Sequence, residues 1–95
     1  MTLASGFLEA EGYVAIFHAV DAMTKATNVT VRGVVKLGGG LVAVSVTGDL
    51  ATVEEAIAVG SEAANVHAPS RHRSIVFANP SAPVETLALN PGVLI

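Results

Sequence analysis

The sequence predicts an α+β domain whose elements follow the order β-α-β-β-α-β and end in a short helix. Two observations support this prediction. Valine recurs at alternate positions in residues 29–37 and 41–47, which is the period of a strand, whereas residues 13–27 carry large apolar side chains at helical spacing. Glycine and proline residues separate these segments, so each predicted element has a defined end.

The chain begins with a predicted strand and a predicted helix. Residues 3–11 alternate as a strand does, with Ser5, Phe7 and Glu9 on one side, and Gly12 ends the run. The helical pattern follows in residues 13–27, with a stripe formed by Tyr13, Ile16, Phe17, Val20 and Met23 and with alanines on the other faces. Because this helix has almost no polar face, we expect it to pack on a sheet and also against a neighbouring subunit.

Residues 29–37 and 41–47 form a predicted hairpin around three consecutive glycines. Alternation assigns one face of the first strand to Val29, Val31, Gly33, Val35 and Leu37. In the second strand the expected core face is Val42, Val44 and Val46. A two-residue turn needs at most two glycines, so the third indicates either a loosely specified loop or a close approach to its backbone.

A second helix is predicted for residues 50–65, with Asp49 competing as N-cap against a capping box formed by Thr52 and Glu55. Residues 71–78 read as a short strand that Pro80 stops, and "SAPVETLAL" indicates a short terminal helix. The complete order is that of the ferredoxin-like split βαβ pattern, an antiparallel sheet with two helices on one face.

The composition indicates self-association. Of 95 residues, 52% are hydrophobic and only 14% are charged, against a usual charged fraction of about 25%. So few charges leave apolar surface on an isolated small domain, and such surface is typical of protein–protein contact. The absence of cysteine excludes disulfides and thiolate-ligated metals. A net charge of −3 argues against nucleic-acid binding.

The sequence predicts a cytoplasmic protein without membrane contact. Its longest charge-free stretches, such as residues 37–48, are shorter than the ~20 apolar residues that span a bilayer. Residues 1–12 contain two glutamates and no basic residue, so we expect no signal peptide.

Several ordered motifs together resemble the bacterial microcompartment shell-protein domain. They are E-x-x-G at residues 9–12, D-A-M-x-K-x-x-N at 21–28, K-(I/L)-G-x-G at 36–40 and an (R/T)-G-D turn at 47–49. The resemblance implies a single shell domain over residues 3–90, with a short tail at 91–95. It also implies cyclic homohexamers that tile edge to edge with other shell proteins and enclose enzymes, with no catalysis and no cofactor.

The resemblance assigns roles to two groups of residues. Lys25 and Asn28 match residues at the hexamer edge, as do Asn79 and Pro80, although the family usually carries arginine where Asn79 stands. Asparagine lacks the planar guanidinium group with which arginine donates several hydrogen bonds at once. Contact between hexamers is therefore weaker here, or is made by Arg71 or Arg73 instead, or is specialised for one neighbour; the sequence leaves these alternatives open.

The second group lines the pore in the family: Lys36, Leu37, Gly38, Gly39 and Gly40. Gly39 stands where serine is frequent, so the expected pore is lined by backbone, is wider or more mobile than a serine-lined one, and favours anionic or polar small metabolites.

Other candidate sites are weaker. His18, His67 and His72 show no metal-ligand spacing, and Glu54 and Glu55 are typical first-turn helix acids, so no metal site and no catalytic site are expected. An alternative function is a ferredoxin-like oligomer that regulates or binds a metabolite between subunits, because this fold carries many functions.

Overall fold

The structure, a computed structural model, describes residues 3–94. Its elements are β1 (Ala4–Glu11), α1 (Tyr13–Ala26), β2 (Thr30–Gly38), β3 (Leu41–Gly48), α2 (Leu50–His67), β4 (His72–Phe77), α3 (Ala82–Leu89) and the 3₁₀ helix η1 (Pro91–Leu94). The predicted element order is confirmed, with boundaries shifted by at most a few residues. Ile95, the last residue of the predicted tail, lies outside the described residues.

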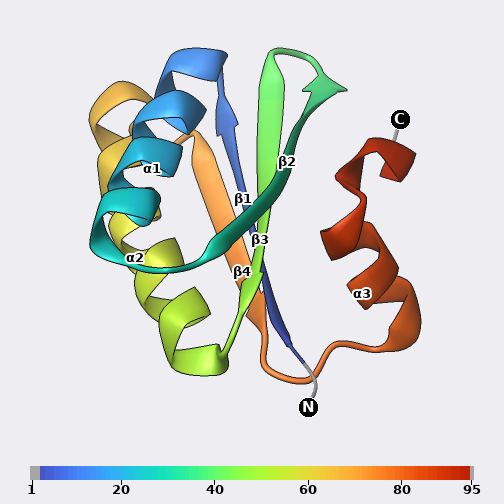
Figure 1. Ribbon diagram of the computed structural model, residues 1–95. Helices are drawn as coiled ribbons and strands as arrows, with labels where there is room; N and C mark the ends of the chain where they lie inside the picture. Colours follow the sequence, from blue (N-terminus) through green and yellow to red (C-terminus); the bar gives the residue numbers. More distant parts are fainter. Residues whose placement is uncertain (1–2, 95) are drawn as a thin grey trace.

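The four strands form one antiparallel sheet in the order β2-β3-β1-β4. β1 and β3 are the inner strands, and β2 and β4 are the edges. Figure 1 shows α1 and α2 side by side on one face of the sheet and α3 on the other. The ferredoxin-like arrangement is therefore confirmed, and the C-terminal helix adds a third layer.

The core lies between the sheet and the pair α1 and α2. The valines of β3 that were expected to face it are all buried, and so are Leu8 of β1 and Ile16 of α1. The two helices approach closely because α2 presents Gly60 to Met23: a Cβ atom at Gly60 would lie only 2.9 Å from the Met23 sulfur. Small residues at this crossing thus allow the two helices to share one core.

Only part of the large apolar stripe predicted for α1 is buried. The buried residues of the helix are Ala15, Ile16, Ala19 and Met23. Tyr13 and Phe17 are instead 45% and 59% exposed, with their rings 5.5 Å apart. The alanine side of the helix packs inward because it allows a closer approach to α2 and the sheet, which leaves an aromatic pair on the surface.

Strand β2 departs from the simple alternation that was predicted for it. Its pairing with β3 shifts by one residue between Val31 and Gly33 and again between Lys36 and Gly38. Paired residues of antiparallel strands share a face. Val31, opposite Val46, therefore points toward α1 and α2, whereas Val35, opposite Ala43, points toward α3. The prediction of one face for Val31 and Val35 is wrong because the first bulge inserts one unpaired residue between them.

Helix α2 starts with the simpler of its two candidate caps. The Asp49 side chain accepts a 3.0 Å hydrogen bond from the Thr52 backbone N–H and a 2.8 Å bond from the Thr52 hydroxyl. The N–H and hydroxyl of Thr52 lower the pKa of the Asp49 carboxyl. Asp49 is the N-cap, and Thr52 supports it rather than capping the helix itself.

The C-terminal segment covers one side of the second sheet face. The buried hydroxyl of Ser45 donates a 2.8 Å hydrogen bond to the Ala88 carbonyl of α3. Pro91 is buried and packs against Gly33 of β2. A Cβ atom at Gly33 would lie only 2.9 Å from the Pro91 ring. The start of the predicted tail is therefore packed against β2.

Candidate assembly surfaces and glycine turn

The turn between β2 and β3 is built from glycines in the left-handed region. Gly38, Gly39 and Gly40 have φ values of 92°, 62° and 84°. Gly38 pairs with Leu41, so Gly39 and Gly40 are the two central residues of the turn. Positive φ at both central positions is what a type I′ hairpin turn requires. We call residues 38–40 the glycine turn.

Steric crowding inside the subunit does not explain why these three residues are glycines. A Cβ atom at Gly38 or Gly39 would have nothing within 4 Å, and one at Gly40 would meet only a Glu11 side-chain carbon at 3.8 Å. Backbone conformation alone accounts for these residues within one chain. The turn is tied to the rest of the subunit by a 2.8 Å hydrogen bond from the Gly12 N–H to the Gly40 carbonyl.

Lys36 and Leu37 lie immediately before the glycine turn, where the second bulge of β2 occurs. Lys36 is exposed, and Leu37 is 36% exposed. The structure therefore brings all five residues of the predicted pore group to one exposed hairpin tip. Figure 1 shows this tip projecting from one end of the sheet.

The predicted edge residues lie at the opposite end of the sheet. Ala4 pairs with Gly48 and Ser5 with Phe77 at the end where α1 finishes and the segment after β4 begins. This end carries the edge set, which consists of Lys25, Asn28, Asn79 and Pro80. An eight-residue strand such as β1 spans roughly 26 Å, so the edge set and the glycine turn are separated by the length of the sheet.

The members of the edge set differ in exposure. Lys25, Asn28 and Asn79 are exposed, whereas Pro80 is buried. The Lys25 ammonium lies 2.9 Å from the carboxylate of Asp21, one helical turn earlier. Three side chains of the set are thus available to a partner, and the burial of Pro80 holds the segment that presents Asn79.

Arg71 and Arg73 lie at the glycine-turn end. Arg71 forms a 2.6 Å ion pair with Glu11 at the last position of β1, and Arg73 pairs across the strands with Glu9. The two arginines therefore lie at the other end of the sheet from the predicted edge residues. The alternative that they take part in the contact between hexamers stays a prediction.

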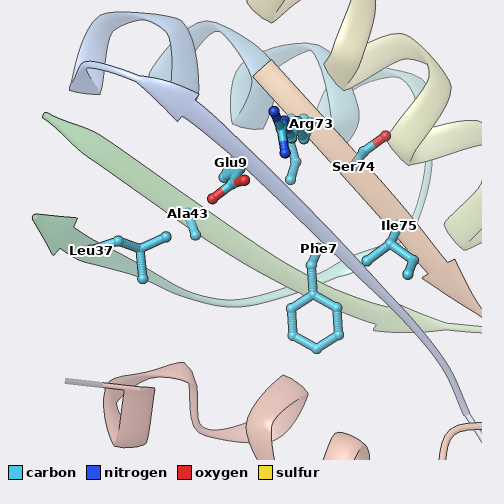
Figure 2. A pocket seen from close by; sticks show the side chains of 8 residues that line it. Phe7, Glu9, Leu37, Ala43, Arg73, Ser74 and Ile75 are labelled. Carbon is cyan, nitrogen blue, oxygen red and sulfur yellow. The ribbon is translucent and has the colours of Figure 1, made fainter. Parts of the chain in front are cut away.

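The uncovered part of the second sheet face is hollow. The hollow has a volume of about 290 Å³ and is lined by Phe7, Leu8, Glu9, Leu37, Ala43, Arg73, Ser74 and Ile75. Figure 2 shows Phe7, Ile75 and Leu37 around it, with Glu9 and Arg73 on adjacent strands. Ile75 is 51% exposed. We call this the sheet hollow; the sequence indicated it only through the placement of Phe7 and Glu9 on one face of a strand.

A second apolar surface lies on the other side of the molecule. It consists of Tyr13, Val14 and Phe17, which are 45%, 58% and 59% exposed, and we call it the helix patch. Figure 1 shows α1 on the face of the sheet opposite α3. Phe7 of the sheet hollow lies on the α3 face, because it pairs with Ser45, which bonds to Ala88 of α3. The helix patch and the sheet hollow therefore belong to opposite sides of the sheet.

The histidines lie in two different surroundings. The rings of His18 and His67 stack between α1 and α2 with centroids 4.0 Å apart, whereas His72 Nδ1 lies 3.1 Å from the Ala68 carbonyl oxygen. Within residues 3–94, His, Cys, Asp and Glu side chains do not gather in threes as they would around a metal ion. Over the same residues, no helix has both the length and the apolarity to cross a bilayer.

The fold and the two ends of the sheet define a split βαβ domain with a glycine turn at one end and a lysine-bearing helix at the other. The model of the BMC domain matches residues 4–80 of the chain. The chain therefore belongs to the BMC-domain family of bacterial microcompartment shell proteins.

Named relatives agree with this assignment. Carboxysome shell protein CcmK2 of Synechocystis sp. is 43% identical over 65 residues, which are 68% of this chain and 63% of that protein. Bacterial microcompartment shell protein PduA of Citrobacter freundii is 44% identical over 61 residues, which are 64% of this chain and 66% of that protein. The match spans between 55% and 63% of the length of the first carboxysome relatives.

A solved structure supports the fold alone. The crystal structure of a microcompartments protein from Desulfitobacterium hafniense DCB aligns with a TM-score of 0.78 at 22% identity, covering 94% of this chain and 48% of that one. The family resemblance inferred from the motifs is confirmed. The names of these relatives are those of shell proteins, which agrees with the function expected from the motifs.

Proposed function

We propose that this protein is a tile of a bacterial microcompartment shell in the cytoplasm, where cyclic homohexamers join edge to edge around enclosed enzymes. The observation that carries the proposal is the separation of the glycine turn and the edge set by the length of the sheet. A subunit with these two groups at its opposite ends fits a radial position in a disc. The glycine turn then points to the centre and Lys25 to the rim.

The helix patch and the sheet hollow supply the contacts between subunits of the ring. They are different surfaces on opposite sides of one chain, so each meets its complement only on another copy. Contact between two unlike surfaces is heterologous, and it generates a closed ring when the rotation between copies closes. Tyr13 and Phe17 of one subunit would then fill the hollow around Phe7 and Ile75 of the next, which removes both apolar surfaces from water.

At the centre, six glycine turns line the pore with backbone atoms, flanked by Lys36 and Leu37. Glycine at position 39 leaves room for the chains to approach the axis and gives the pore no side-chain hydroxyl. Backbone N–H groups and the nearby Lys36 ammonium favour small polar or anionic metabolites. At the rim, Lys25, Asn28 and Asn79 contact neighbouring hexamers of this or other shell proteins, and Pro80 positions Asn79.

Electron microscopy and size measurement of the purified protein test this proposal. We expect hexagonal discs that associate into sheets or tubes. Lys25→Ala should leave hexamers intact and abolish sheets, whereas Lys36→Ala, which removes an exposed lysine at the other end of the sheet, should leave the sheets in place. A discrete dimer or trimer without lateral assembly would contradict the proposal, and sheets that persist in Lys25→Ala would contradict the role of Lys25.

The ring contact has a separate test. Phe17→Asp places a charge in the helix patch and should convert hexamers to smaller species, because the charge would have to be desolvated in the sheet hollow. Val66→Asp is the matched control: Val66 is 74% exposed on α2, outside the helix patch, and its replacement should leave the hexamer intact. Intact hexamers in Phe17→Asp would exclude the helix patch from the ring contact.

A further inference from the structure

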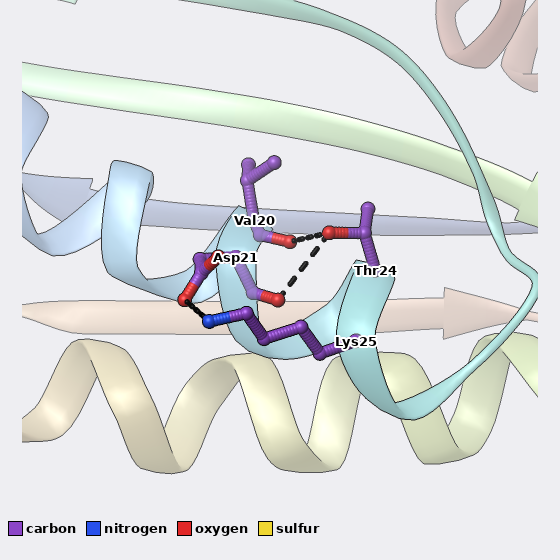
Figure 3. A network of polar contacts seen from close by, with 4 residues as sticks. All are labelled: Val20, Asp21, Thr24 and Lys25. Carbon is purple, nitrogen blue, oxygen red and sulfur yellow. Dashed lines mark hydrogen bonds and ion pairs between the residues drawn. The ribbon is translucent and has the colours of Figure 1, made fainter.

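The outward side of α1 carries an ion pair near the end of the helix. Lys25 Nζ lies 2.9 Å from Asp21 Oδ2, and the two side chains are 75% and 59% exposed. Figure 3 shows the pair beside Thr24, whose hydroxyl donates to the Val20 carbonyl at 2.8 Å and so is directed back to its own helix. This stretch therefore presents one anion and one cation, a helical turn apart, to any approaching surface.

The pair has little importance for the isolated helix. Exposed ion pairs at this spacing contribute only slightly to stability, because water and salt screen both charges. Each group also has more hydrogen-bonding capacity than this one contact uses, since an ammonium has three donors and a carboxylate accepts at both oxygens. Asp21 and Lys25 are therefore free to bind additional charged groups without leaving each other.

We propose that Asp21 is a positioning residue of the hexamer edge, which forms a reciprocal charge network with Lys25 of the adjoining hexamer. This inference rests on the proposed function, which places Lys25 at that edge. Two identical edges that meet about a twofold axis perpendicular to α1 bring their α1 helices together antiparallel. Asp21 of one edge then faces Lys25 of the other, and the same contact recurs on the far side of the axis.

The network explains how this edge accommodates two lysines. Two Lys25 ammonium groups at one seam would repel each other, and in this chain position 79 carries an uncharged asparagine. The two Asp21 carboxylates balance the lysines and accept their hydrogen bonds. A parallel approach of the same helices would place lysine opposite lysine and aspartate opposite aspartate, so the order of the two charges selects the antiparallel contact.

Charge reversal at each position tests this arrangement. Asp21→Lys gives an edge with two cations, and Lys25→Asp gives an edge with two anions. We expect each variant alone to form hexamers but no sheets. Mixing the two preformed hexamers should restore lateral association between unlike hexamers, in mixed pairs and short rows. A closed sheet is not expected, because any three mutually adjacent hexamers include two of the same variant. Sodium chloride should dissociate these mixed assemblies, because it screens the contacts between opposite charges. Glu54→Lys, a charge reversal on the exposed start of α2, should assemble as the unchanged protein does.

The outcomes separate this inference from the proposed function. Circular dichroism and size measurement establish that each variant folds and forms hexamers. If Lys25→Ala abolishes sheets while Asp21→Lys assembles normally, the edge role of Lys25 stands and the role of Asp21 is overturned. Mixed variants that remain separate hexamers overturn it too. If the unchanged protein forms no sheets, the proposed function itself fails.

Discussion

The hydroxyl of Ser45 on β3 donates a 2.8 Å hydrogen bond to the carbonyl oxygen of Ala88 in α3. Both residues are buried, and Ala88 lies in the last turn of its helix, where carbonyls lack a donor within the helix. This bond attaches the C-terminal helix to the second face of the sheet. It also explains a serine at a position in β3 that faces away from the main core.

Ser45→Ala should therefore lower the free energy of unfolding by about 1–2 kcal/mol, because it leaves the Ala88 carbonyl buried without its donor. Urea denaturation of the two proteins measures the difference. The matched control is Ser5→Ala: Ser5 is as buried as Ser45, but its Oγ has no hydrogen-bond partner among the described residues. That change should be neutral or stabilising. Equal losses in the two variants would show that the hydrogen bond is not the cause.

Two buried glycines should differ in their response to alanine. At Gly6 a Cβ atom would lie 2.8 Å from Ile57 Cγ1 and 2.9 Å from Val53 Cγ1, and branched side chains in a full core adjust poorly. We expect Gly6→Ala to cost about 1–3 kcal/mol of unfolding free energy. At Gly60 the neighbour is Met23, which is more adaptable, and alanine gains about 1 kcal/mol of helix propensity. Thermal unfolding should therefore show a smaller loss for Gly60→Ala; the reverse order would contradict this packing argument.

The glycine turn permits a test of backbone strain without steric crowding. A Cβ atom at Gly39 would meet nothing within 4 Å, yet φ at this residue is 62°. Gly39→Ala should lower the unfolding free energy of the subunit by about 1 kcal/mol. Gly39→Asn should cost less, because asparagine adopts this conformation more readily and favours the type I′ turn. Equal stability of all three proteins in chemical denaturation would mean that the turn relaxes to another conformation.

Asp49 should make stability depend on pH in the acid range. The Thr52 N–H and hydroxyl lower its pKa from the ordinary value of 3.8. Its stabilising effect is therefore fully present above the ordinary pKa and is lost as pH falls through the lowered one. The difference in Tm between the unchanged protein and Asp49→Ala should shrink as the solution is acidified from pH 5. Asp49→Asn keeps an oxygen cap but does not titrate, so its Tm relative to Asp49→Ala should stay nearly constant over the same range.

The sequence by itself determined the order of elements, the core valines of β3 and the position of the glycine turn. These features depend on local chemistry: the spacing of apolar side chains and the run of three glycines between two strand-like segments. The motifs also identified the family and the residues of the two predicted sites. Such features are readable along the chain because the residues that specify each of them are close in sequence.

Tertiary structure alone decided which surfaces those elements expose. The helical stripe on α1 contained both Ile16, which is buried, and Phe17, which is exposed. The packing of α1 on α2 and on the sheet decides which of the two is covered. The bulge in β2 set the face of Val35 through its partner on β3. Likewise, the position of Arg71 at the glycine-turn end is known from its ion pair with Glu11 and not from its place in the chain. Side-chain direction in such cases depends on contacts between residues distant in sequence, whose relative positions no local pattern specifies.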